Sequence, residues 1–274
     1  MLNNDMTNAG TITMTRPQIP AARIILPTEH GSWSFLFEPI VVGFALAFSA
    51  SAPWIALIAI CAFFARQPLK TAFVARKNKE LSRRATKFVL IFGALAAAGL
   101  IGAVLTADAW VFYPFAVAAP LALQQAVLDL SKRSRNLLAE LTGAVAISSS
   151  VAAISLAGGL GWPAAVALWA VFVARFIPSI LYVRNRLLLE KGKPYERLQP
   201  IASHFISLSM IAGLAMIGFA SWLTVGMFAF LAVRCVHGMS SYRVKMKAMK
   251  IGVWEVIYGT LTVVSIIAGY YIGF

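Results

Sequence analysis

Acidic residues and cysteines are scarce in this chain of 274 residues. The sequence contains 10 Asp and Glu residues against 24 Lys and Arg residues, and 12% of its positions are charged while 60% are apolar. In a soluble domain about a quarter of the residues are charged, and they provide its polar surface. The composition therefore excludes a soluble globular protein and predicts a membrane protein.

Motifs for metal, nucleotide or disulfide chemistry are also lacking. The two cysteines, Cys61 and Cys235, both fall inside apolar segments, so neither a disulfide framework nor a CxxC site is expected. The histidines show no HExxH or repeated HxxxH spacing, and the sequence contains no glycine-rich phosphate loop. We therefore expect no metal and no cofactor.

Long apolar runs dominate what is present. A helix that crosses the ~30 Å hydrocarbon layer needs about 20 apolar residues. Nine segments approach this length and predict an all-α, polytopic bundle of nine transmembrane helices. They span residues 33–50, 52–69, 87–106, 108–126, 137–157, 161–183, 201–221, 224–239 and 252–273.

The links between these segments alternate in charge. The links after the second, fourth, sixth and eighth segments carry several Lys and Arg residues each, and the other four carry none. Because basic loops stay in the cytoplasm, this pattern predicts a multi-pass membrane protein with the N-terminus inside and the C-terminus outside. Residues 1–30 are expected to form a cytoplasmic lead-in, and residues 31–274 the transmembrane domain.

The formal net charge of +14 is explained by the same links. Basic residues beside a membrane attract anionic lipid headgroups, so lipids are the expected partners and nucleic acid is not. The sequence does not identify a protein partner.

Ionisable residues also occur within the segments, near their cytoplasmic ends. Such residues usually face the interior of a bundle, because a charge in lipid costs several kcal/mol. Their placement predicts a polar cavity that opens to the cytoplasm beneath an apolar chamber. The residues are Glu38, Arg66, Glu140, Arg175, His204, Arg234, His237 and Glu255.

Helical spacing groups these residues into stripes, because positions three or four apart share a face. The longest stripe contains Arg175, Ser179, Tyr182 and Arg186, and a second contains Arg234 and His237. In the second segment Arg66 and Lys70 align, and Pro68 is expected to end or bend that helix. Three acids thus face three arginines at similar depth. The acids are Glu38, Glu140 and Glu255, and the arginines are Arg66, Arg175 and Arg234. They either pair with one another to hold the bundle together or leave a site for an anion.

The string Pro27-Thr28-Glu29-His30-Gly31-Ser32-Trp33 resembles the opening motif of the bacterial YwiC-like family of membrane proteins. Arg66-Gln67-Pro68-Leu69 and Tyr182-Val183-Arg184 resemble two further elements of that family. The resemblance extends over the helical body and implies a location in a bacterial inner membrane, but it implies no assigned activity.

The nine-helix arrangement also resembles that of the UbiA-type intramembrane prenyltransferases. These enzymes hold a prenyl diphosphate and Mg²⁺ through two Asp-rich motifs, after the second and sixth helices. Here those places carry Arg66-Gln67-Pro68-Leu69-Lys70 and Arg184-Asn185-Arg186, and no Asp-rich motif occurs. Mg²⁺ needs carboxylate oxygens, so transferase activity of the metal-dependent kind is not supported. Arginines can still bind an anionic head directly.

Three functions remain open from the sequence. The first is a protein that binds or modifies a lipid or isoprenoid with an anionic head. In this function, the head would be bound by Arg66, Lys70, Arg175, Arg184, Arg234 and His237, and the candidate acids or bases are Glu38, Glu140 and His30. The second is a transporter of a small anion or a proton-coupled solute. The third is a structural membrane partner whose charges form interhelical ion pairs only.

Overall fold

The computed structural model describes residues 20–26 and 32–273, except the side chains of Arg23 and Ser32. This part of the chain is helical and contains nine long helices, as the sequence predicts, and one short helix that precedes them. The helices are α1 (Ala21–Ile25), α2 (Ser32–Ala47), α3 (Ala52–Val74), α4 (Lys79–Thr106), α5 (Tyr113–Leu130), α6 (Leu137–Ala157), α7 (Trp162–Glu190), α8 (Leu198–Met216), α9 (Trp222–Gly238) and α10 (Ala248–Ile272), with the 3₁₀ helix η1 (Ala109–Phe112) before α5.

Seven of the described helices are long and apolar enough to cross a membrane, which makes the chain a multi-pass membrane protein. The other two long helices, α2 and α9, have 16 and 17 residues and are also apolar. Helix α3, one of the seven, ends later than residue 69, where the sequence predicts its end. It continues through Pro68 to Val74, because an internal proline removes one backbone hydrogen bond and the rest of the ladder persists.

Side-chain caps and prolines set where several helices begin. Asn78 and Asn136 accept hydrogen bonds from the backbone N–H groups of Leu81 and Leu138, at the starts of α4 and α6. Ser221 does the same for Thr224 at the start of α9. These caps satisfy N–H groups that have no partner within the helix. Prolines near the first position of α3, α5 and α7 begin those helices without losing a hydrogen bond.

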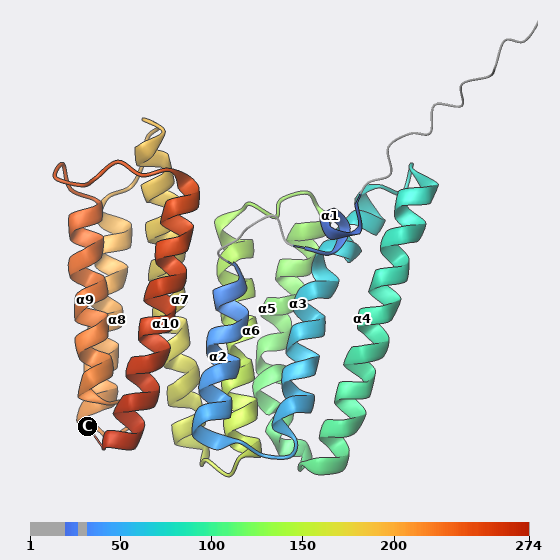
Figure 1. Cartoon of the computed structure of the whole chain (residues 1–274), viewed down its shortest axis with the longest axis horizontal. Helices are drawn as coiled ribbons and strands as arrows, with labels where there is room; N and C mark the ends of the chain where they lie inside the picture. Colours follow the sequence, from blue (N-terminus) through green and yellow to red (C-terminus); the bar gives the residue numbers. More distant parts are fainter. Residues whose placement is uncertain (1–19, 27–31, 274) are drawn as a thin grey trace, which may run out of the picture.

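The bundle has two sides joined by a central pair of helices. Helices α3, α4 and α5 lie on one side, α7 to α10 lie on the other, and α2 and α6 lie between them (Figure 1). Close approach of α2 and α6 depends on small residues: the backbone of Gly158 lies against Ala47, and Gly43 lies against Ile154. A larger residue at either glycine would push these two central helices apart.

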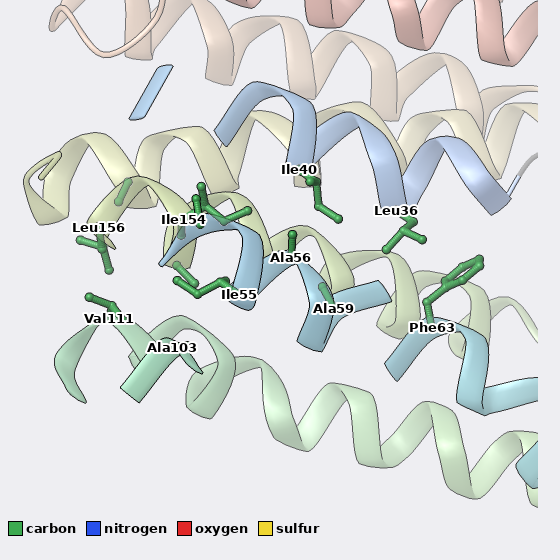
Figure 2. Packing of buried hydrophobic residues seen from close by; sticks show 14 residues of the cluster. Leu36, Ile40, Ile55, Ala56, Ala59, Phe63, Ala103, Val111, Ile154 and Leu156 are labelled. Atoms are coloured by element: carbon green, nitrogen blue, oxygen red, sulfur yellow. The ribbon is translucent and has the colours of Figure 1, made fainter. Parts of the chain in front are cut away.

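The buried apolar residues form one large cluster on each side of α6. The first cluster joins α2, α3, η1 and α6 and includes Leu36, Ile55, Phe63 and Ile154, as Figure 2 shows. The second joins α2, α6 and α7 to α8, α9 and α10 through residues such as Phe172. The two clusters fix the positions of α3 and α7 relative to the central helices.

The four basic links all lie at one end of the bundle, which we call the basic end, and the four links without Lys or Arg lie at the other (Figure 1). At the basic end, the buried guanidinium of Arg186 on α7 donates to the carbonyl oxygens of Gly238 and Val244. Glu190, one turn later, pairs with Arg186 at 2.8 Å and with Arg243 at 3.6 Å. These contacts hold the link between α9 and α10 against the end of α7.

Candidate functional site

A cavity of about 560 Å³ lies between α3, α5 and α6, with one residue of α2. Its walls are polar towards the basic end and apolar farther in. The lining residues of the apolar part are mostly alanines, including Ala59, Ala62, Ala118, Ala119 and Ala122. Helices α3 and α5 contact each other little but both pack on α6, so space remains between them. This cavity therefore has the polar part and the apolar chamber that the sequence predicts.

Arg66 is the central cation of the polar part. Its guanidinium donates from Nε and Nη2 to one carboxylate oxygen of Asp129, at 3.1 and 2.9 Å. With the amide oxygen of Gln125 turned towards it, Arg66 also donates to that oxygen at 3.0 and 2.8 Å. Two residues of α5, one helical turn apart, thus fix the orientation of an arginine on α3.

A glycine on α6 leaves the space that the side chain of Gln125 occupies. The Gln125 amide lies directly against Gly143 on α6, where any β-carbon would overlap it. Both residues are buried, and they bring α5 and α6 together beside the guanidinium of Arg66. Gly143 is therefore a requirement for the geometry of the polar part.

Further charges surround the mouth of the cavity. Lys70, one turn after Arg66, donates to the hydroxyl of Ser134 at 2.7 Å, and Arg135 is exposed nearby in the same link. Glu140 at the start of α6 pairs with Arg184 of α7 at 3.6 Å. Arg184 in turn donates to the backbone oxygen of Arg135 at 3.0 Å. Cations from α3, the α5–α6 link and α7 therefore converge at this end.

A second charged group, which does not line the cavity, lies among the C-terminal helices. Glu255 on α10 accepts from Arg234 on α9 at 2.5 Å and lies 3.7 Å from Arg175 on α7. The guanidinium of Arg234 also lies over the rings of Tyr182 and Tyr258, 4.2 and 4.6 Å from their centroids. One carboxylate thus joins three helices through two arginines, of which Arg175 is buried.

Glu38 lies near Arg175 and Glu255 of the C-terminal charged group. It is buried on α2, and its carboxylate rests directly against Gly259 of α10. Glu38 therefore contacts the C-terminal side of the bundle and is not a residue of the cavity lining.

The structure divides the residues that the sequence grouped as one site. Arg66, Lys70 and Glu140 line the cavity, and Arg184 reaches it through Glu140. Arg175 and Arg234 belong to the second group, and His237 is exposed on α9. The predicted stripe on α7 is confirmed, because Arg175, Ser179, Tyr182 and Arg186 are all buried. His30 lies outside the described residues.

Sequence reasoning missed Gln125, Asp129, Ser134 and Arg135, and with them the partner of Arg66. The prediction ended the fourth segment at residue 126, whereas α5 continues to Leu130. The available signal was the spacing of Gln125 and Asp129, which places two polar side chains on one face of the helix.

The lining of the cavity does not fit a Mg²⁺–diphosphate site. Its two acids, Asp129 and Glu140, each pair with an arginine, and they come from different helices. No group of three or more His, Cys, Asp or Glu residues among those described could hold a metal ion. The chemistry available at this end is the direct binding of an anion by guanidinium and ammonium groups.

Comparisons with known proteins bear on the family and the fold. The family model of the YwiC-like proteins matches residues 26–155, which confirms the resemblance seen in the sequence. Among curated proteins, none matches this chain. A solved structure from a study of digeranylgeranylglyceryl phosphate synthase in membranes is similar over 86% of this chain and 92% of its own, with 12% identity and a TM-score of 0.56. At this identity the likeness establishes a UbiA-like fold only.

Proposed function

From the match to the YwiC-like family and the UbiA-like fold, we propose that this membrane protein binds an amphiphile with an anionic head in the cavity between α3, α5 and α6. The head lies at the basic end, against Arg66, Lys70 and Arg135, and the apolar part lies along the alanine-rich walls. One observation carries the proposal: a single cavity combines fixed cations at one end with an apolar chamber at the other.

The electrostatics of Arg66 support binding at this place. Asp129 accepts from the Nε–Nη2 edge of the guanidinium and Gln125 from its Nη1–Nη2 edge, which orients the group, and the side chain keeps 38% of its surface exposed. An oriented and accessible guanidinium binds a carboxylate or phosphate with little loss of conformational entropy. Asp129 therefore acts as a positioning residue for Arg66.

Orientation in the membrane follows from the basic links. We propose that the basic end faces the cytoplasm of a bacterial inner membrane, because Lys and Arg in short loops are retained there. The anionic head then lies near the inner leaflet. If the protein also modifies its ligand, Glu140 is a candidate acid or base, because it lines the cavity whereas Glu38 contacts α10.

Native mass spectrometry of the protein extracted with its surrounding lipids tests the proposal. We expect a co-purifying anionic amphiphile whose occupancy falls about tenfold or more in Arg66→Gln, since a charge-assisted hydrogen bond contributes about 1.5 to 3 kcal/mol. Arg133→Gln is the matched control, because Arg133 is exposed at the same end and does not line the cavity.

Occupancy that is equal in Arg66→Gln and in the control would overturn the assignment of the head to this end. The absence of any anionic amphiphile, both after extraction and after addition of alkyl phosphates, would overturn the proposed function itself.

A further inference from the structure

The apolar part of the cavity is short. On α3 its lining runs from Arg66 to Ile58, and on α5 from Gln125 to Phe115. At a rise of 1.5 Å per residue these stretches correspond to about 12 to 15 Å. An extended chain advances about 1.2 Å per bond, as an extended polypeptide does. The chamber therefore accommodates about ten to twelve bonds beyond the head.

Buried side chains close the far end of the chamber. Ile55 on α3, Val111 in η1 and Leu156 on α6 are buried and belong to one apolar cluster. Figure 2 shows these three side chains near one another, beyond Ala59 and Phe63, which line the chamber. A longer chain would have to displace this packed cluster, and overpacking a core costs about 1 to 3 kcal/mol.

The volume restricts the number of chains. A cavity of about 560 Å³ lies within the range of about 300 to 1,000 Å³ that holds one small ligand. The chains of a bilayer phospholipid each reach through one leaflet, which is about 15 Å deep, and there are two of them. The cavity thus has room for one short chain.

The charges restrict the head. Among the described lining residues, Arg66, Lys70 and Arg135 are cations, and Asp129 and Glu140 are carboxylates. This leaves one net positive charge, or two when Arg184, the partner of Glu140, is included. A head with one or two negative charges, a carboxylate or a phosphate monoester, balances this excess.

From the depth of the chamber, its closed far end, the volume of the cavity and its net charge, we infer that the ligand is a single-chain amphiphile. Its head is a carboxylate or phosphate monoester, and its apolar chain has about ten to twelve bonds. The inference rests on the proposed function and specifies its ligand class. Alanines on α3 and α5 set the width of the chamber, and the cluster around Ile55 sets its length.

The test uses alkyl phosphates and alkyl carboxylates of about six to sixteen carbons with the full-length protein in neutral phosphatidylcholine nanodiscs. Binding to the protein is divided by partitioning into empty nanodiscs. We expect this ratio to stay constant up to about ten to twelve carbons and then to fall about fourfold for each further methylene, which cannot enter the chamber. Comparison of the two series identifies the preferred head.

Two variants separate the length of the chamber from binding of the head. Ala119 lies six residues, about 9 Å, from Gln125, so Ala119→Leu should shorten the limiting chain by about three to five carbons. Ala116→Leu is the control, because Ala116 lies on the same helix, is exposed and does not line the cavity. Arg66→Gln should weaken binding at every length without moving the limit.

The outcomes distinguish the two proposals. A ratio that stays constant to sixteen carbons, or a limit that Ala119→Leu leaves unchanged while six-carbon probes still bind, overturns the chain-length inference and leaves anion binding intact. Failure of every anionic probe to bind, or a preference for alkyl trimethylammonium probes of the same length, overturns the proposed function.

Discussion

Two charged regions at similar depth differ in what surrounds them. Near the cavity, the side chain of Arg66 pairs with Asp129 and is still 38% exposed, whereas on the C-terminal side Arg175 is 2% exposed and shares Glu255 with Arg234. The first arginine has an accessible face for a ligand, and the second is enclosed by packed helices. The alternatives of ion pairing and anion binding therefore apply to different parts of one molecule.

The difference arises from the helices that carry the charges. Helices α9 and α10 pack against each other, and α7, α9 and α10 all contribute to one buried apolar cluster, so the charges that they carry lie close to one another. Helices α3 and α5 both pack on α6 and contact each other little, which leaves the space that the alanines line. Charge alone did not distinguish the two regions, because small residues on α3 and α5 create the cavity.

The largest effect is expected from Glu255→Gln. The substitution leaves the buried Arg175 and its neighbour Arg234 without their shared counter-charge, which should lower the free energy of unfolding by about 3 to 5 kcal/mol. Unfolding in mixed micelles measures this loss. Glu80→Gln, at an exposed position on α4, should change it by less than about 0.5 kcal/mol. Equal stability of the two variants would contradict a structural role for the C-terminal group.

Gly143→Ala should have the next largest effect, on the cavity side. Its methyl group overlaps the Gln125 amide and forces α5 away from α6, which should destabilise the protein by about 1 to 3 kcal/mol and displace Arg66. Gly213→Ala meets nothing within 4 Å and should instead stabilise α8 by about 0.5 to 1 kcal/mol. Thermal unfolding of the pair, with amphiphile binding measured beside it, checks both signs.

Exchange of the Arg66–Asp129 pair separates stability from binding. The double variant Arg66→Asp, Asp129→Arg keeps an ion pair between α3 and α5, so its stability should return to within about 1 kcal/mol of the original protein. Binding of a decyl phosphate should stay about tenfold weaker, because the cation is then on the other wall. Full recovery of binding would show that the ion pair alone matters and that Arg66 does not bind the head.

The smallest effect is expected at His237, which the sequence included among the ligand-binding residues. The side chain is exposed on α9, so His237→Ala should change the free energy of unfolding by less than about 0.5 kcal/mol and leave amphiphile binding unchanged. A loss of binding in this variant would place part of the site on the C-terminal side and would remove the distinction between the regions.

Much of the fold follows from the sequence, because apolar length and loop charge are local properties of each segment. All nine predicted segments correspond to helices, and the stripe of Arg175, Ser179, Tyr182 and Arg186 is buried as its spacing predicts. The pairing of charges did not follow, because it depends on which helices touch. Asp129 lies beyond the predicted end of its helix and yet is the partner of Arg66.

Photolabelling tests the distinction between the two regions most directly. A ten-carbon alkyl phosphate with a diazirine near the end of its chain would be bound to the protein in nanodiscs, irradiated and mapped by peptide mass spectrometry. We predict labels on α3, α5 and α6, near Ala59, Ala62 and Ala119, which Arg66→Gln reduces about tenfold. Labels concentrated on α7, α9 and α10, or labels that Arg66→Gln does not reduce, would contradict the assignment of the ligand to this cavity.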